Sequence, residues 1–276
     1  MNPLFQSIAL GMLQGVTELF PISSLGHSIL LPAVLGWRVG EGAGDFLTFL
    51  VATHFATALV LLLLYWQDWR RIVGGLVSSN PDARLGWLLI AGTVPAGLVG
   101  LLLEKQVRLF FLSPRSAAVC LALNGALLFL AERLRRTAKS AAGESDPDRR
   151  IATELSGWQA VKVGVLQILA LIPGFSRTGA TLAGSLLVGL SHEDALRFSF
   201  LLATPIIGAA AVLKLPKLLA AGGGAFEFAL VGGVAAAVAA YASVKILTRY
   251  FKTKTLTPFA IYCGVAGLAC LVALAR

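Results

Sequence analysis

Residues 14–27 read Q-G-V-T-E-L-F-P-I-S-S-L-G-H, and this polar stretch lies within otherwise apolar sequence. It carries a carboxylate at Glu18, an imidazole at His27 and three hydroxyls, and Pro21 interrupts any helix that runs through it. Ionisable side chains at membrane depth cost roughly 2.5–3.5 kcal/mol on insertion scales, so they usually mark a functional site. Residues 172–181 read I-P-G-F-S-R-T-G-A-T, again with a proline break and now with Arg177. An acid, a nucleophile and an imidazole in one stretch, with a cation in the other, suit an anionic, phosphorylated substrate.

The composition places the chain among integral membrane proteins. Of its 276 residues, 57% are hydrophobic and 13% are charged, and the mean hydropathy is +0.81, far above the range of soluble domains. A net charge of +9 would favour nucleic-acid binding in a soluble domain. Here the basic residues gather in short loops between apolar runs, which is the positive-inside pattern. We therefore expect the lipid bilayer as a partner and no nucleic acid.

The apolar runs predict an all-α integral membrane protein that forms a single membrane domain over residues 1–276. Short apolar pieces flank Pro21 and Pro173, and because a crossing needs about 20 residues, each pair predicts a re-entrant helical hairpin, over about 4–37 and 158–190. Irregular backbone at that depth is tolerated where it is buried in protein or lines a cavity. The first repeat is 1–132, the linker 133–155 and the second repeat 156–276. The predicted spans are about 46–66, 85–103, 115–132, 196–215, 226–247 and 257–275.

Three short sequence matches in the same order relate the two halves. They are G-M-L-Q with G-V-L-Q, P-I-S-S with P-G-F-S, and F-L-V-A-T with F-L-L-A-T, starting at Gly11 and Gly164, Pro21 and Pro173, Phe49 and Phe200. A hairpin and three spans give an odd number of crossings, so we predict an inverted-topology repeat of the kind whose sites form near the midplane. The loop charges predict a cytoplasmic linker, with both termini and the mouth of the first hairpin facing outward.

The spacing within the first stretch places its polar groups on common faces. Gln14 and Glu18 are four residues apart and share a face on a helix. Ser24 and His27 share a face if a helix begins just after Pro21, and its N-terminal N–H groups would then form an anion cradle. In isolation, a serine in a membrane helix more often packs against backbone than acts as a nucleophile, and His27 alone could be a satisfied buried histidine.

The second stretch adds groups that bind oxyanions. Arg177 can hold phosphate oxygens through two parallel N–H bonds, as lysine cannot, and Gly174 and Gly179 allow the backbone to approach a ligand closely. A structural alternative is an ion pair between Glu18 and Arg177 that ties the hairpins together. His54, inside a predicted span, is interpreted as a residue that faces other helices.

The two stretches resemble the two signature motifs of the bacterial undecaprenyl-diphosphatase family, the BacA/UppP type linked to bacitracin resistance, and the length and hydropathy pattern resemble the family over essentially the whole chain. The resemblance implies a multi-pass enzyme of the bacterial plasma (inner) membrane that hydrolyses undecaprenyl diphosphate to undecaprenyl phosphate and inorganic phosphate. It also implies recycling of the lipid carrier for peptidoglycan synthesis. With the loop charges, it implies a site that opens to the outer, periplasmic face.

Carried over by position, the resemblance implies catalytic roles for four residues: Glu18, Ser24, His27 and Arg177. The substrate-binding candidates are Gln14, Ser23, Gly174, Ser176, Thr178, Gly179 and Thr181. Gln14 departs from the glutamate of many members, and the lost charge weakens any claim that this position ligates a metal. We expect a divalent cation, Mg²⁺ or Ca²⁺, with Glu18 as a candidate ligand, and no organic cofactor.

The expected reaction is phosphoryl transfer. Ser24 attacks the terminal phosphorus to form a transient phosphoserine, and Arg177 stabilises charge on the phosphoryl oxygens. Glu18 and His27 handle protons. The sequence leaves open which of these two is the base, and whether water attacks directly with Ser24 only as a hydrogen-bond donor.

Two other functions share features with this sequence. The type-2 phosphatidic acid phosphatases share a Pro-Ser-Gly-His element that S-S-L-G-H resembles, but they need a second histidine at the place where this chain has Ala183. A lipid-phosphate flippase or transporter would use the same inverted repeat. That reading explains Arg177 and both hairpins, but it does not explain why an acid, a serine and a histidine cluster on one of them.

Overall fold

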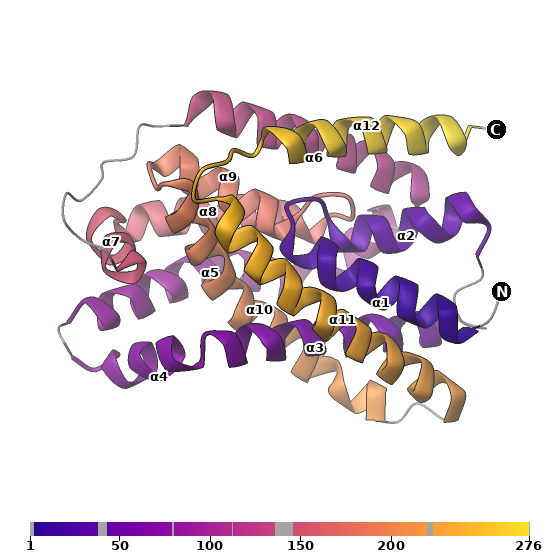
Figure 1. The fold of residues 1–276 in the computed structure, drawn as a ribbon, viewed down its shortest axis with the longest axis horizontal. Helices are drawn as coiled ribbons and strands as arrows, with labels where there is room; N and C mark the ends of the chain where they lie inside the picture. Colours follow the sequence, from indigo (N-terminus) through magenta and orange to yellow (C-terminus); the bar gives the residue numbers. More distant parts are fainter. Residues whose placement is uncertain are drawn as a thin grey trace.

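The computed structural model describes residues 3–37, 43–78, 80–111, 113–135, 146–219 and 223–275, and within them all regular structure is helical. Figure 1 shows a bundle in which most helices run roughly along the long axis of the molecule. The helices are α1 Pro3–Leu19, α2 Ser24–Leu35, α3 Ala43–Leu64, α4 Trp66–Gly75, α5 Pro81–Phe111, α6 Pro114–Leu134, α7 Pro147–Glu154, α8 Gly157–Gln167, the 3₁₀ helix η1 Ile168–Leu171, α9 Arg177–Val188, α10 His192–Leu219, α11 Gly223–Tyr250 and α12 Thr257–Ala273.

Five of the long helices are apolar enough to cross a membrane within the described residues. Their apolar segments are Phe46–Leu64, Pro81–Leu103, Pro114–Leu134, His192–Pro216 and Gly223–Tyr250. These segments fall on five of the six predicted spans, so the prediction of an all-helical, multi-pass membrane protein is confirmed. The sixth predicted span, 257–275, is the shorter apolar helix α12 of 17 residues.

The first predicted break is a turn between two helices. α1 ends at Leu19 and α2 begins at Ser24, so Pro21 lies in the turn. Ser23 caps α2, because its side chain accepts a hydrogen bond from the Gly26 N–H at 3.2 Å. Ser23 has a φ of 70°, a left-handed conformation that is uncommon for a residue with a side chain. The turn therefore holds a strained residue directly before Ser24.

The second predicted break has a similar form. α8 passes into the short helix η1, and the chain turns through Pro173 and Gly174 before α9 begins at Arg177. Gly174 has a φ of 104°, and an added Cβ there would meet the backbone of α6 at Ala117, so only glycine suits this turn. Ser176 caps α9 through the Gly179 N–H at 3.0 Å. Both helix pairs agree with the predicted breaks, while their re-entrant character and the inverted repeat stay predictions.

Small residues bring the helices that carry the site into close contact. α1 packs along α11, where a Cβ added to Gly11 would collide with the backbone of Gly232. α8 packs on α5, where Gly164 meets the backbone of Gly92 in the same way. Small residues of this kind let membrane helices approach until their backbones touch. The two helix pairs are thus set firmly against the long helices.

Two short helices were not predicted. α4 follows α3 after a single residue, and α7 lies inside the predicted linker 133–155, of which residues 136–145 lie outside the described part. Their charges pair with each other: the buried Asp148 of α7 accepts hydrogen bonds from Arg71 of α4 at 2.5 Å and from Arg197 of α10 at 2.9 Å. These ion pairs form in three dimensions between distant segments, so hydropathy along the chain does not reveal them.

The two ends of the bundle carry different helices. In Figure 1, α1 begins and α12 ends at one end of the molecule, and α4 and α7 lie at the other. Which end faces which side of the membrane stays a prediction. Between these ends, the turns of the two helix pairs face each other.

Candidate active site

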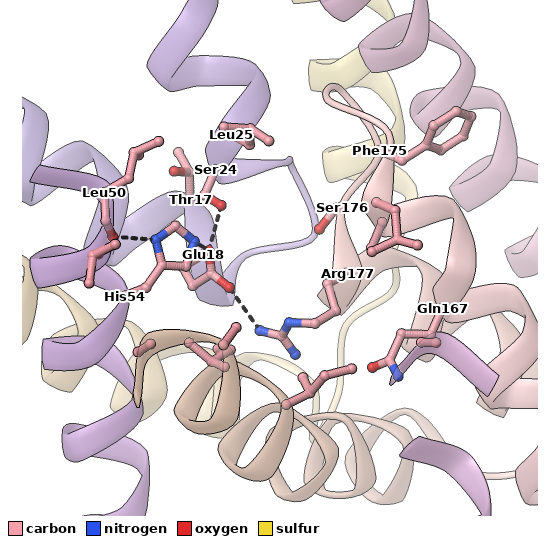
Figure 2. Close-up of a pocket in the computed structure, with 18 of the residues that line it drawn as sticks. Thr17, Glu18, Ser24, Leu25, Leu50, His54, Gln167, Phe175, Ser176 and Arg177 are labelled. Carbon is pink, nitrogen blue, oxygen red and sulfur yellow. Dashed lines mark hydrogen bonds and ion pairs between the residues drawn. The ribbon is translucent and has the colours of Figure 1, made fainter. Parts of the chain in front are cut away.

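A pocket of about 270 Å³ lies between the two turns, with walls from α3 and α10. Figure 2 shows that the labelled polar side chains from α1, α2, α3 and α9 converge in it. The polar lining residues are Thr17, Glu18, Ser24, His54, Gln167, Ser176, Arg177 and Lys214. The remaining lining residues are apolar, so the pocket joins a small polar centre to a hydrophobic wall. That combination suits a ligand with an anionic group and an apolar chain.

Glu18 is the centre of this polar group. Its side chain is buried, and its Oε1 lies 3.1 Å from Nη2 of Arg177 in an ion pair. Its Oε2 accepts a hydrogen bond from the Ser24 hydroxyl at 2.5 Å. The Glu18 carbonyl accepts a further hydrogen bond from the Thr178 hydroxyl at 3.0 Å. The acid of the first stretch therefore binds the cation of the second, as the structural alternative expected, and contacts the candidate nucleophile at the same time.

Ser24 and Arg177 occupy equivalent places in their helices. Ser24 is the first residue of α2, and Arg177 is the first residue of α9, so the two helix N-termini carry the reactive side chains into the pocket. Arg177 uses only one of its terminal nitrogens on Glu18. Its Nη1 is buried and has no hydrogen-bond partner among the described residues, which leaves an N–H group able to bind an oxyanion in the pocket.

Gln14 lies behind the carboxylate and not on the pocket wall. Its Nε2 donates a hydrogen bond to Oε2 of Glu18 at 3.0 Å and lies 3.3 Å from Nε2 of His54. Its Oε1 accepts a hydrogen bond from Ser28 at 3.4 Å. The predicted shared face of Gln14 and Glu18 is confirmed, and in this position Gln14 orients Glu18.

His54 is the residue that sequence reasoning missed. It lines the pocket from α3, with Nε2 3.4 Å from Oε2 of Glu18. Its Nδ1 is 2.7 Å from the Leu50 carbonyl, which fixes the ring with Nε2 facing the site. The signal was present in the sequence, because His54 is the single ionisable residue within the Phe46–Leu64 span.

His27 faces a different neighbour. Its Nδ1 lies 2.7 Å from the Ser23 carbonyl and its Nε2 lies 2.8 Å from the Tyr262 hydroxyl of α12, with the two rings stacked at 5.7 Å between centroids. It does not line the pocket that contains Glu18 and Ser24. Both ring nitrogens of His27 are therefore occupied in holding the first turn against α12.

The remaining candidates mainly fix the turns. Ser23 and Ser176 are helix caps, and Thr181 of α9 bonds the Arg177 carbonyl at 3.0 Å and lies 2.5 Å from the Ser199 hydroxyl of α10. Ser176 also reaches the pocket wall. Gly179 is packed against Ser176 and Asn124. These residues place Ser24 and Arg177 and leave Ser176 as the one of them that meets the pocket.

Asn124 of α6 joins the two turns. Its side-chain N–H donates a hydrogen bond to the Pro21 carbonyl at 3.0 Å, and its side-chain oxygen accepts one from the Ser176 N–H at 3.0 Å. Asn124 is fully buried, so both turns depend on it for partners that water would otherwise supply. A single asparagine in an apolar helix gave no sequence signal for this role.

The donor set does not form a protein cage for Mg²⁺ or Ca²⁺. In the described part of the chain, no three His, Cys, Asp or Glu side chains lie together as a metal-binding group would require. The one carboxylate of the pocket already contacts Arg177 and Ser24. Among the described residues that line the pocket, a cation would find the Glu18 carboxylate and would take its other oxygen ligands from substrate or water.

Known proteins match this chain over most of its length. The sequence model of the family described as bacitracin resistance protein BacA matches residues 7–269, which include both polar stretches. The chain belongs to the BacA family. Among this family's proteins, the undecaprenyl-diphosphatase of Mycolicibacterium paratuberculosis is 48% identical to the chain, over 98% of it and 97% of the relative. Undecaprenyl-diphosphatase 2 of Chromobacterium violaceum is 47% identical, over 95% and 97%.

The residues matched by the BacA family model include those that line the pocket. The matched residues contain Glu18, Ser24, His54 and Arg177, and these side chains meet although they come from four helices. The likeness to the two relatives extends over nearly the whole length of both chains.

Proposed function

We propose that this protein is a membrane phosphatase that hydrolyses undecaprenyl diphosphate to undecaprenyl phosphate and inorganic phosphate. The observation that carries the proposal is the Ser24 hydroxyl, 2.5 Å from Oε2 of Glu18, beside a carboxylate-bound Arg177 in a pocket with apolar walls. Relatives that match nearly the whole chain bear the name undecaprenyl-diphosphatase. The product is the lipid carrier of peptidoglycan synthesis, so its recycling would confer bacitracin resistance.

In the first step, Ser24 attacks the terminal phosphorus of the substrate. Its proton passes to Oε2 of Glu18, to which the hydroxyl already donates. The new bond joins Oγ to phosphorus, and the bond between phosphorus and the bridging oxygen breaks, so undecaprenyl phosphate leaves. Glu18 then returns this proton to the phosphate oxygen of the departing undecaprenyl phosphate and is a carboxylate again. In the second step, water attacks the phosphoserine and Glu18 takes the water proton. The bond between Oγ and phosphorus breaks, Glu18 passes the proton to Oγ of Ser24, and inorganic phosphate is released.

Arg177 and His54 support this chemistry from opposite sides of Glu18. Arg177 neutralises charge on the phosphoryl oxygens, for which its Nη1 is unengaged among the described residues. His54, 3.4 Å from Oε2 of Glu18, can accept or return a proton through that carboxylate. The same geometry gives His27 no direct contact with the reacting groups, so we assign it to positioning the first turn.

If a divalent cation takes part, we propose that it binds together with the substrate. Since the protein offers Glu18 as the single carboxylate in the pocket, the diphosphate oxygens would have to supply the other ligands, as is common for Mg²⁺ at phosphate sites. The steps above rest on Ser24, Glu18 and Arg177 and do not require it.

The proposed setting is the bacterial inner membrane, with an inverted repeat of two re-entrant helix pairs and a pocket that opens to the periplasmic face. Support comes from the sequence matches between the halves, from the turns at Pro21 and Pro173, and from the location of both termini at one end of the bundle in Figure 1. The outward opening follows from the loop charges.

Phosphate release from undecaprenyl diphosphate by the purified protein in detergent tests the proposal. We expect stoichiometric undecaprenyl phosphate and inorganic phosphate from the wild type and none from Glu18→Gln, which keeps the shape but loses the base. A protein that releases no phosphate, yet moves labelled lipid across the bilayer of proteoliposomes, would instead be the flippase considered above.

A further inference from the structure

Gln167 is a buried glutamine whose amide has no partner within the described residues. It is the last residue of α8, and its exposed fraction is 1%. Neither its Oε1 nor its Nε2 makes a hydrogen bond. Native proteins rarely leave both ends of a buried amide unsatisfied, because each lost hydrogen bond to water is uncompensated. The position therefore suits a ligand whose polar atoms can pair with this amide, since no described residue does so.

The amide belongs to the same pocket as the unpartnered nitrogen of Arg177. Gln167 and Arg177 both line the pocket, and Nε2 of Gln167 and Nη1 of Arg177 are the buried N–H groups of its lining that have no partner among the described residues. In the view of Figure 2, Gln167 lies on the side of the Arg177 guanidinium that is opposite to Glu18. Two N–H groups without acceptors in one pocket, one of them charged, match the oxygens of a phosphoryl group.

Comparison with the first half shows why this amide is unengaged. Gln14 and Gln167 are the last residues of the matching segments G-M-L-Q and G-V-L-Q. The amide of Gln14 donates a hydrogen bond to Glu18, which lies four residues later in the chain. Four residues after Gln167 the chain has Leu171. The second half thus lacks the carboxylate that occupies the amide in the first, and its glutamine remains available to a ligand.

We propose that Gln167 is a substrate-binding residue that donates a hydrogen bond from Nε2 to a phosphoryl oxygen of the diphosphate, beside Nη1 of Arg177. This inference rests on the proposed function and specifies which groups hold its substrate. Gln167 cannot take up or release a proton at neutral pH, so its contribution is binding. It contacts the diphosphate both before and during reaction, and its loss therefore raises KM more than it lowers kcat.

The test is Gln167→Met, which keeps the length of the side chain and removes its polar atoms. We expect KM for undecaprenyl diphosphate to rise about tenfold to a hundredfold, as for other hydrogen bonds to charged groups, with kcat changed by less than about threefold. We expect the thermal midpoint of the ligand-free protein to stay the same or rise, since a buried unsatisfied amide is lost. A fall in that midpoint with an unchanged KM would show a structural role and overturn the inference.

Two further variants sharpen the test. Gln167→Glu keeps the shape but brings a carboxylate towards the phosphate, so we expect a larger rise in KM than for Gln167→Met, and it carries the test should the methionine variant not fold. The matched control is Ser185→Ala in α9: Ser185 is buried and its hydroxyl is also unpartnered among the described residues, but it does not line the pocket. The control is expected to leave KM unchanged.

Inorganic pyrophosphate separates failure of this inference from failure of the proposed function. If the wild type hydrolyses the lipid and Gln167→Met keeps a normal KM, only the role of Gln167 is wrong. If the wild type releases no phosphate, stabilisation against heat by pyrophosphate still reports on the anion site, and we expect it in the wild type and less of it in Gln167→Met. A wild type that neither hydrolyses the lipid nor is stabilised by pyrophosphate would overturn both proposals.

Discussion

At the scale of single residues, the pocket is organised by one carboxylate with several partners. Oε1 of Glu18 contacts Arg177, and Oε2 contacts Ser24, Gln14 and His54. An oxygen with three polar neighbours in a buried site is held in one orientation, which is the condition for efficient proton transfer. In the proposed reaction, Arg177 binds this carboxylate through one terminal nitrogen and a phosphoryl oxygen through the other. Substitutions of single side chains can test each of these roles.

Ser24→Ala and Ser176→Ala should differ although both serines line the pocket. Ser24 bonds to Glu18 at 2.5 Å, whereas the Ser176 hydroxyl caps α9 and lies 3.4 Å from the Phe20 carbonyl. We expect Ser24→Ala to abolish hydrolysis, and Ser176→Ala to lose about 1 kcal/mol of stability with its cap while turnover remains measurable. Quenched-flow with substrate labelled in its terminal phosphate checks both variants and detects a phosphoserine in the wild type. Substantial turnover in Ser24→Ala would favour direct attack by water.

Arg177→Lys tests whether the geometry of the cation matters. A lysine keeps the charge but cannot bind Glu18 and a phosphoryl oxygen through separate, fixed N–H groups. We expect a loss of about 2–4 kcal/mol of transition-state stabilisation, similar to the loss of a charge-stabilising donor in other enzymes. Steady-state kcat/KM measures it, with a melting curve to show that the variant is folded. Near-normal turnover in Arg177→Lys would show that Arg177 acts only through its structural ion pair with Glu18.

The paired variants His54→Phe and His27→Phe compare the two histidines at constant ring shape. We expect His54→Phe to lower kcat at least about tenfold and to flatten the dependence of kcat/KM on pH between ~5 and ~8, where a histidine titrates. We expect His27→Phe to keep measurable turnover and its pH dependence, and to lower the thermal midpoint because it loses the hydrogen bond to Tyr262. The opposite pattern would return the proton-transfer role to His27.

At the scale of elements, the site depends on two turns that are held by α6. Asn124 bonds Pro21 in one turn and Ser176 in the other. We expect Asn124→Ala to leave the Ser176 N–H without an acceptor, at about 1–3 kcal/mol, and the Pro21 carbonyl with only the weak Cys263 thiol donor at 3.8 Å. The variant should lower both the thermal midpoint and kcat. The matched control is Asn124→Asp, which keeps the acceptor for the Ser176 N–H. It should therefore preserve the hydrogen bond to the second turn and lose the one to Pro21 in the first. Full activity in the alanine variant would show that the turns hold without α6.

The proline breaks and most of the long helices could be predicted, because Pro21 and Pro173 act on the local chain and apolar length is local as well. The direction in which the His27 ring points could not be predicted. It shares a helix face with Ser24, but the left-handed Ser23 and the Tyr262 hydroxyl of α12 turn its ring towards α12. The role of Asn124 was equally out of reach, since it depends on partners in other elements. His54 did give a signal as an ionisable residue in an apolar span, but its partner Glu18 lies in another helix and could not be predicted. α4 and α7 are stabilised by ion pairs that no local pattern encodes.

At the scale of the whole molecule, the arrangement predicts which ends of the protein face which side of the membrane. Reporter fusions at Ala142 in the linker, which lies outside the described residues, and at the C-terminus after Ala275 would test it. We expect the first to be cytoplasmic and the second periplasmic, because α12 ends at the end of the bundle that is opposite to α7 in Figure 1. Both reporters on one side would contradict the proposed number of crossings.

The ion pair between Glu18 and Arg177 also has a consequence for biosynthesis. The two residues are 159 positions apart in the chain, and ribosomes add about 5–20 residues per second. Glu18 is therefore synthesised roughly 8–30 seconds before its counter-charge. Throughout that interval the Glu18 carboxylate lacks Arg177, and of its side-chain partners only Gln14, Ser24 and His54 have been made. The catalytic centre is completed only when α9 arrives, which makes the formation of the active site a late step in the insertion of this protein.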